Sequence, residues 1–442
     1  MSPIAHPHRS LADPSRSGAP RGPATGPVPR YTAYPTADRF VEAFGSEDLQ
    51  HALWQRANGA VVGGCAPLVI HVRVPSACGP GRIGRYLQSL GGEISLVASM
   101  LGSARAASRL DLGGPALLRL SRSELARLVD SLRQSFCFEG APRMSVEVDT
   151  GPLVEGRLAH LRQLGFGELV VDTTSASASP AAGAPESAIR LVASARRLGF
   201  DASCVRLPEW ASTQGRVAFR SLLRRMLAVR PDRLALPSPS EALRGESPAG
   251  RADRDDETIA LLEAAGYVRL GLEDFALRTH GLAIAREQGR LFLGLGGFDD
   301  SPCADRIALG AGAVGQVGAS YYQNLTDVAC YEAAIAGGRL PVERGLALAR
   351  DDLARRSVIH ALVCQGRVDF ESIRLAHLID PQVHFACELA EMRSLAEAGL
   401  ATMDDAAIEL TAAGRRSANA VAAVFDRYRR ARARRNECAA LQ

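Results

Sequence analysis

A chain of 442 residues is long enough for a large hydrophobic core and two or three domains. Its formal net charge of +4 is too small to argue for a nucleic-acid surface. All 52 basic residues are arginine, which excludes a lysine Schiff base and a phosphate loop of the GxxxxGK[ST] type.

The cysteines are dispersed, and no two of them stand at CxxC or CxxxC spacing. Such a set in a large chain predicts reduced, mostly buried thiols and a cytoplasmic protein. No apolar run reaches membrane-spanning length, so we expect no membrane association. The nine cysteines are Cys65, Cys78, Cys137, Cys204, Cys303, Cys330, Cys364, Cys387 and Cys438.

The amino-terminal residues are rich in Pro, Ser, Gly and Arg and lack the apolar stretch of a signal peptide, which predicts a disordered tail. The segment RYTAYPTA follows, with two tyrosines beside a proline. We expect an ordered arm there, packed either on a flat ligand or on one end of the domain that follows. The expected segments are a tail (1–29), an arm (30–66), a barrel (67–300) and a C-terminal helical domain (301–442).

Short apolar runs alternate with helical patterns between residues 68 and 240. Six strands alternating with helices indicate parallel βα units with right-handed crossovers. We therefore predict an α/β fold with a partial (β/α)6 parallel barrel; an open doubly wound sheet is the alternative. The expected strands are 68–74, 108–113, 143–149, 167–173, 201–206 and 232–236, and the expected helices are 85–101, 121–136, 153–164, 185–198 and 214–229.

The rest of the chain is predicted to be mainly helical. Residues 241–256 are polar and indicate a surface excursion, and LATMDDAAIEL indicates two short strands around an Asp-Asp turn. Together with the neighbouring helices this predicts a winged-helix-like module. Its basic end, RYRRARARR, is typical of a solvated helix terminus, and nucleic-acid binding is the alternative.

Several blocks of the sequence, taken together over residues 30 to 430, resemble the oxygen-independent coproporphyrinogen III oxidases, the HemN family of radical SAM enzymes. The resemblance implies a partial barrel that holds a four-iron–four-sulfur cluster and S-adenosylmethionine and that decarboxylates coproporphyrinogen III. The blocks are RYTAYPTA, SVEVD, HLRQLGFGEL, RPDRLAL, ALGAGAVGQVGASYYQN and GLALARDDLARRSVIHALVCQGRVDF.

The family's cluster requires three thiolates at CxxxCxxC spacing on the loop after the first barrel strand. Here those positions fall on Ala77, Gly81 and Gly84. Shifting the alignment to use Cys78 places arginines at 82 and 85, so neither register offers more than one thiolate. We predict no cofactor; the alternative is a cluster and S-adenosylmethionine retained with help from distant cysteines.

Other family contacts to S-adenosylmethionine are degenerate as well. The glycine turn after the second strand is shortened to Gly113 and Gly114, while Glu147 on the third strand is retained. The family's tyrosine and histidine before the cysteines fall on His71 and Arg73.

For a tetrapyrrole with four carboxylates, the resemblance and the chemistry of guanidinium suggest arginine partners at Arg30, Arg73 and Arg206. His71 is a candidate axial haem ligand or an ordinary core histidine. The remaining candidate substrate-binding residues, which are stacking or family positions, are Tyr31, Tyr34, Tyr321 and Asn324.

These observations leave three hypotheses. The preferred one is a HemN-like pseudoenzyme of porphyrin metabolism that binds coproporphyrinogen III or haem, or regulates a protein partner. The second is an active coproporphyrinogen III dehydrogenase that converts propionates to vinyls. The third is a nucleic-acid or structural binder that uses the winged module.

Overall fold

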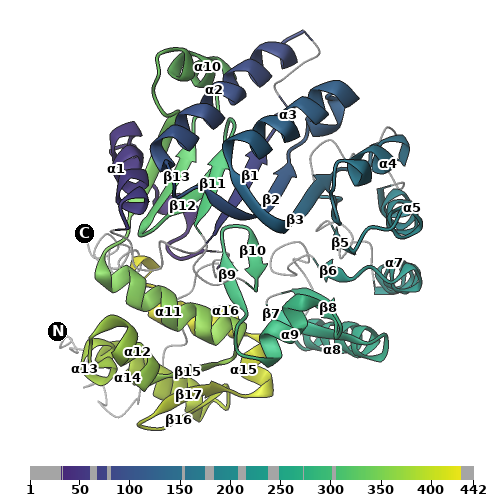
Figure 1. The fold of residues 1–442 in the computed structure, drawn as a ribbon. Helices are drawn as coiled ribbons and strands as arrows, with labels where there is room; N and C mark the ends of the chain where they lie inside the picture. The colour runs from purple at the N-terminus through teal and green to yellow at the C-terminus, as the bar shows by residue number, and fades with distance from the viewer. Residues whose placement is uncertain are drawn as a thin grey trace, which may run out of the picture.

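The computed structural model describes most of the chain and contains one large sheet, its covering helices and a smaller helical module (Figure 1). The described residues are 31, 33–59, 67–76, 81–151, 155–174, 184–207, 216–236, 248–271, 273–300 and 305–429.

Six parallel strands form the centre of the large sheet, and each pairs with the next one along the chain. This arrangement confirms the partial (β/α)6 barrel. The strands are β1 (Leu68–Arg73), β2 (Ala106–Gly113), β3 (Cys137–Val148), β4 (Glu168–Asp172), β5 (Ala202–Arg206) and β6 (Arg233–Ala235). The helices between them are α2 (Ile83–Leu101), α3 (Arg122–Ser135), α4 (Glu155–Gln163), α5 (Ala184–Arg197) and α7 (Arg216–Val229).

The sheet continues beyond the six strands on both sides, to twelve strands in all. A parallel strand and three antiparallel ones extend it from β1, so the domain boundary expected at residue 301 falls inside the sheet. The added strands are β11 (Arg306–Leu309), β12 (Val314–Val317), β13 (Ser320–Asn324) and β14 (Val342–Ala347), and on the β6 side β8 (Asp274–Leu277) and β7 (Tyr267–Gly271).

One local expectation is corrected. The surface excursion expected over 241–256 is helical from Pro248 onward, because α8 (Pro248–Ala264) extends further towards the amino terminus than the apolar pattern indicated. Residues 237–247 lie outside the described part of the chain.

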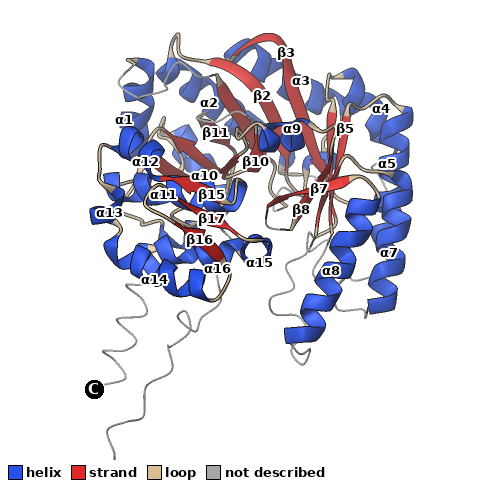
Figure 2. Ribbon diagram, turned by 90° about the horizontal axis from the view of Figure 1, so that it is seen from below, coloured by secondary structure: helices blue, strands red, loops and turns tan. Residues whose placement is uncertain are grey.

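The C-terminal module contains a three-stranded antiparallel sheet, and Figure 2 shows it on the opposite side of the molecule from α5, α7 and α8. Its hairpin turns at Asp404 and Asp405, as the sequence predicted. The elements are α11 (Arg350–Cys364), β15 (Arg367–Asp369), α12 (Phe370–His377), α13 (Pro381–His384), α14 (Ala386–Glu397), β16 (Ala401–Met403), β17 (Ala407–Leu410), α15 (Ala412–Arg416), α16 (Ala418–Ala422) and η3 (Ala423–Phe425).

Smaller elements connect these parts. They are η1 (Ala37–Arg39), α1 (Ser46–Ala57), η2 (Leu117–Arg119), α9 (Gly281–Glu287), β9 (Phe292–Gly294), β10 (Gly297–Asp299) and α10 (Val328–Ala336). Within the described residues, no helix combines the length and the apolar character that crossing a bilayer requires.

Alternation along the barrel strands determines where the main core lies. Successive side chains of a strand point to opposite faces, so apolar and polar positions that alternate separate onto the two faces of the sheet. The side chains facing the helices are apolar and buried, among them Ile70, Leu110, Val146 and Leu169. The core therefore fills the layer between sheet and helices, and the concave face of the sheet is left for polar residues.

Candidate ligand site in the barrel lumen

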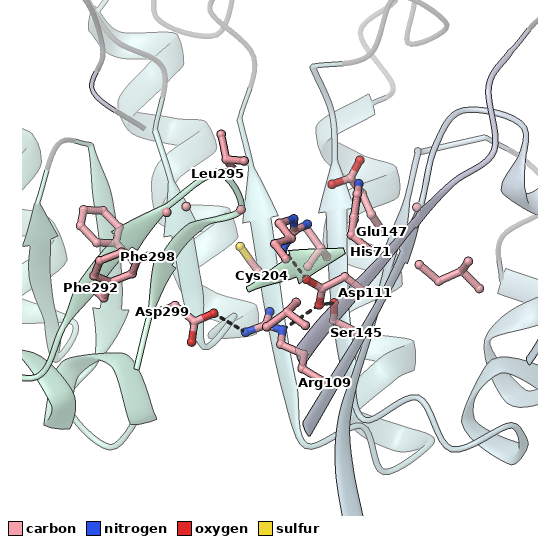
Figure 3. Close-up of a pocket in the computed structure, with 18 of the residues that line it drawn as sticks. His71, Arg109, Asp111, Ser145, Glu147, Cys204, Phe292, Leu295, Phe298 and Asp299 are labelled. Atoms are coloured by element: carbon pink, nitrogen blue, oxygen red, sulfur yellow. Dashed lines mark hydrogen bonds and ion pairs between the residues drawn. The ribbon is translucent and has the colours of Figure 1, made fainter. Parts of the chain in front are cut away.

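The concave face of the barrel encloses a pocket lined mainly by polar and charged side chains (Figure 3). Its cavity volume is about 100 Å³, room for a few water molecules. A packed barrel interior consists of apolar layers, so this lumen is a candidate binding site. The lining side chains from the strands include His71, Arg109, Asp111, Ser145, Glu147, Cys204, Arg206, Arg233 and Arg306.

Asp111 is the centre of a hydrogen-bonded network in the lumen. It accepts hydrogen bonds from Arg109 Nε at 2.7 Å, from Arg306 Nη1 at 2.9 Å and from Ser145 Oγ at 2.6 Å. Burial by itself would raise the pKa of Asp111, but the two guanidinium groups outweigh burial and hold that pKa well below its usual range. Asp111 is therefore an ionised carboxylate, and it is already saturated by protein donors.

Nearer the mouth, Arg206 Nη1 donates to the Glu147 carboxylate across the lumen. The two side chains come from β5 and β3, and each is a little over one-third exposed. This pair occupies the region beside Gly113, where a Cβ would lie 3.1 Å from Glu147 Cβ. Glu147, the retained family residue, is thus engaged by an arginine of this chain.

Gly113 ends β2 and Gly114 follows it, and packing requires a glycine at position 114. Gly114 has a φ of +108°, and a Cβ there would lie 2.4 Å from the carbonyl oxygen of Val74. Only glycine accepts such an approach without strain. The presence of Gly114 therefore follows from the close contact between the ends of β1 and β2, whether or not a ligand binds.

His71 and Cys204 are the two soft potential ligands in the lumen. The Nδ1 atom of His71 is buried without a hydrogen-bond partner, and burial together with Arg306 lowers the pKa of His71 to about 3. Burial raises the pKa of the Cys204 thiol. The pocket therefore presents a neutral imidazole and an uncharged thiol.

The family's cluster positions do not fit a metal cluster in this chain. Gly81 and Gly84 carry no ligating atom, and Ala77 and Cys78 lie outside the described residues. Among the residues that the structure describes, no group of three His, Cys, Asp or Glu side chains could hold a metal ion. Of the positions predicted to contact S-adenosylmethionine, Glu147 pairs with Arg206, and the adjoining cavity has a volume of about 100 Å³.

The predicted substrate-binding residues are dispersed. Arg206 lines the lumen, whereas Arg73 is exposed at the end of β1 and Arg30 lies outside the described residues. Tyr31 and Tyr34 are both fully buried against the C-terminal module, and Tyr31 donates a hydrogen bond to Asp426 at 2.9 Å. In this structure neither ring presents a face to a flat ligand.

Tyr321 and Asn324 on β13 also make internal contacts. Tyr321 donates to the carbonyl oxygen of Tyr34 at 3.0 Å, which helps to fasten the arm. Asn324 donates from Nδ2 to Glu93 Oε1 at 2.6 Å and is fully buried. Both residues lie among packed protein groups and outside the lumen pocket.

Several charged residues of the lumen were not singled out from the sequence, although a signal for them exists. Arginines and acids stand at every second position of β2 and β3, in RLDLG and RMSVEV, which is the pattern of a polar inward face. The residues missed are Arg109, Asp111, Arg233, Asp299 and Arg306, together with the ion pair Arg143–Asp300, which does not line the pocket.

Comparisons with known proteins identify relatives of this chain. No family model matches the chain. The oxygen-independent coproporphyrinogen III oxidase of Escherichia coli is 30% identical over 437 residues, which is 92% of this chain and 94% of that protein. The enzyme of the same name from Pseudomonas aeruginosa is 29% identical over 433 residues, covering 90% and 93%.

A solved structure matches along nearly the whole chain. It is coproporphyrinogen III oxidase (HemN) from Escherichia coli, described as a radical SAM enzyme, with a TM-score of 0.77 and 29% identity, covering 90% of this chain and 97% of that one. The sequence match and the shared fold together lead to one conclusion: this chain belongs to the oxygen-independent coproporphyrinogen III oxidase family.

Proposed function

We propose that this protein works in tetrapyrrole metabolism without radical SAM catalysis, as a HemN-like paralogue that binds a tetrapyrrole or regulates a partner. The observation that carries the proposal is the absence of sulfur from the three cluster positions, Ala77, Gly81 and Gly84. A methyl group or a hydrogen cannot replace a thiolate as an iron ligand.

The lumen supports the same conclusion. At the positions predicted to contact S-adenosylmethionine, this chain has the Arg206–Glu147 ion pair and a cavity of about 100 Å³. Removing one partner of such a pair would leave a charge without its counter-ion in a partly desolvated site. A cofactor that used Glu147 would therefore have to displace Arg206.

What the lumen retains suits recognition of carboxylates. Arg109, Arg206 and Arg306 point into one pocket, and guanidinium groups pair bidentately with carboxylates. The neutral imidazole of His71 offers a coordinating nitrogen, since Nδ1 has no protein partner. A tetrapyrrole with propionate side chains combines both requirements, so coproporphyrin and haem are the ligands to test first.

Family membership alone favours a second candidate, an active coproporphyrinogen III dehydrogenase. That activity would need sulfur ligands from outside the loop after β1. In the described part of the chain the cysteines are Cys137, Cys204, Cys330, Cys364 and Cys387, and none of them joins a group of potential metal ligands.

A binding and turnover experiment separates the two candidates. We expect the purified protein to quench the fluorescence of coproporphyrin III in a saturable way. We also expect it to release no decarboxylated product from coproporphyrinogen III when supplied anaerobically with S-adenosylmethionine and a reductant. Arg206→Gln should weaken the binding by about tenfold, because it removes one charge-assisted contact. Reductant-dependent decarboxylation by the wild-type protein would establish the dehydrogenase instead.

A further inference from the structure

The hairpin formed by β9 and β10 closes one side of the lumen. Both of its strands and its turn line the pocket, and Leu293 and Phe298 anchor it in the core that it shares with α11. Figure 1 shows the hairpin between the barrel strands and α11, and Figure 3 shows its residues facing the polar strands. The hairpin therefore connects the C-terminal module with the interior of the barrel.

The turn of the hairpin rests directly on lumen arginines. A Cβ at Gly296 would lie 2.6 Å from Nη1 of Arg306, so any side chain there would displace the guanidinium. Gly297 has a φ of +97°, and a Cβ there would lie 3.6 Å from Nη2 of Arg233. Gly296 thus allows the backbone to approach Arg306 closely, and Gly297 supplies the left-handed backbone conformation beside Arg233.

Two adjacent acids at the end of the hairpin pair with arginines of neighbouring strands. Asp299 Oδ2 lies 3.6 Å from Arg109 Nη1 on β2, and Asp300 Oδ1 accepts from Arg143 Nη1 on β3 at 2.6 Å. Both acids are about one-fifth exposed, so the contacts are partly desolvated but reachable from solvent. Burial raises the pKa of Asp300 and Arg143 lowers it, and the balance lies below the usual value, which keeps the carboxylate ionised.

The arrangement of these two acids against two arginines resembles the contacts of a bound dicarboxylate. The two carboxylates at the end of the hairpin engage two guanidinium groups on adjacent strands, which is the contact that a ligand with neighbouring acid groups would make. Each guanidinium also has a partner within the sheet, Asp111 for Arg109 at 2.7 Å and Glu168 for Arg143 at 2.9 Å. The cavity that remains, about 100 Å³, holds only a few waters. A ligand as large as a tetrapyrrole therefore enters this lumen only if the hairpin moves.

We propose that the β9–β10 hairpin is an internal pseudo-ligand, whose Asp299 and Asp300 occupy the arginines that bind two carboxylates of an incoming polycarboxylate ligand. Binding then exchanges one set of ion pairs for another, with Arg109 and Arg143 paired before and after. The docked hairpin lowers the apparent affinity for the ligand, because only the fraction of molecules in which the hairpin is undocked can bind. This proposal rests on the proposed function, because it takes the tetrapyrrole propionates as the competing carboxylates.

The test compares two substitutions that break the same ion pair from opposite sides. Asp300→Asn removes one of the two internal carboxylates, whereas Arg143→Gln removes the arginine with which it pairs. Both should increase amide hydrogen exchange over residues 292–299. Coproporphyrin III should then bind about tenfold more tightly to Asp300→Asn and about tenfold more weakly to Arg143→Gln, relative to the wild type. Asp256→Asn, which removes an exposed acid 3.9 Å from Arg416, is the control for a simple change of net charge and should alter neither measurement.

The ligand probe has its own control. Coproporphyrin III tetramethyl ester keeps the ring but carries no carboxylate, so its affinity should be the same for both variants. Two results would overturn the pseudo-ligand proposal. In the first, the affinity for the free acid changes in the same direction in both variants; in the second, that affinity stays constant while hydrogen exchange of the hairpin rises. Either result would mean that the ion pairs only hold the hairpin in place. If neither the wild type nor any variant binds coproporphyrin III although hydrogen exchange of the hairpin rises, the proposed tetrapyrrole binding is wrong. The ion pairs then hold the hairpin in place, and coproporphyrin III does not compete for them.

Discussion

Glu93 shows how a single buried carboxylate is kept in this fold. It lies on α2, only 1% exposed, and accepts hydrogen bonds from Tyr331 Oη at 2.6 Å, Gly310 N at 2.7 Å and Asn324 Nδ2 at 2.6 Å. Burial raises the pKa of Glu93 to about 7, although the three donors oppose the shift. The cluster ties α2 to β13, α10 and the turn after β11, which is how Asn324 comes to serve packing in this structure.

The raised pKa predicts a pH dependence of stability. An acid whose pKa is higher in the folded state stabilises the fold fully below its unfolded pKa, near 4.5, and loses that contribution as pH rises to about 7. Glu93→Gln removes this titration. Between pH 5 and pH 8, the wild type should therefore lose up to about 3 kcal/mol more unfolding free energy than the variant. Urea denaturation at the two pH values measures this difference, and parallel pH dependences of the two proteins would contradict the prediction.

At the same scale, the sequence predicted some lumen residues and missed others. Glu147 and Arg206 were identified as candidate sites, but their ion pair joins residues 59 apart in sequence, and only the barrel's curvature brings β3 and β5 to face each other. The pairing of Asp111 with Arg306 spans 195 residues and depends on β11 adding beside β1. Residue types could thus be recognised, whereas their partners required the topology.

At the scale of elements, the periodicity of apolar residues predicted the strands and helices of the barrel correctly. The six strands were predicted because their outward faces are apolar and β-branched. The hairpin β9–β10 was not predicted, because a glycine-dense stretch carries almost no apolar periodicity. Its position depends on close backbone contacts with Arg306 and Arg233.

Helix α12 ends on a strained residue, which gives an element-scale prediction. Leu378 caps the helix in the left-handed region, with φ +54° and ψ +43°, and is 89% exposed. Leu378→Gly should stabilise the protein by about 1 kcal/mol, because glycine adopts this conformation without the Cβ clash. The matched control is Leu375→Gly inside the same helix, also exposed at 69%, which should cost about 1 kcal/mol. Thermal unfolding of the two variants should therefore shift in opposite directions, and a lowered Tm for both would contradict the account.

At the scale of the whole molecule, the arm joins the two ends of the described chain. Tyr31 and Tyr34 are fully buried, and the phenol oxygen of Tyr31 donates to Asp426, 395 residues away. The backbone N–H of Arg427 donates to Tyr34 Oη at 3.3 Å. The arm thus closes the C-terminal module against the barrel side of the chain, an arrangement that the sequence left open between ligand stacking and packing.

The packing of the arm on the C-terminal module predicts the effect of removing the hydroxyl group of Tyr31. Tyr31→Phe leaves the ring but removes the donor to Asp426, which is 5% exposed, so the substitution should cost about 1–3 kcal/mol of stability. Hydrogen exchange should rise over residues 418–429 and stay unchanged in α3. A uniform rise across the chain would show a general loss of stability and not a local fastening.

The central claim is that the loop after β1 lacks the three thiolates that would hold an iron–sulfur cluster, and anaerobic reconstitution with iron and sulfide tests it most directly. The control is Ala77→Cys/Gly81→Cys/Gly84→Cys, which restores the family's three thiolates; a Cβ at Gly81 or Gly84 would meet nothing within 4 Å, so both described positions have room. The account predicts that the wild type stays colourless and the triple variant gains the brown colour and about four irons per chain of a cluster. A wild-type protein that binds about four irons per chain and absorbs like a four-iron–four-sulfur cluster would contradict it.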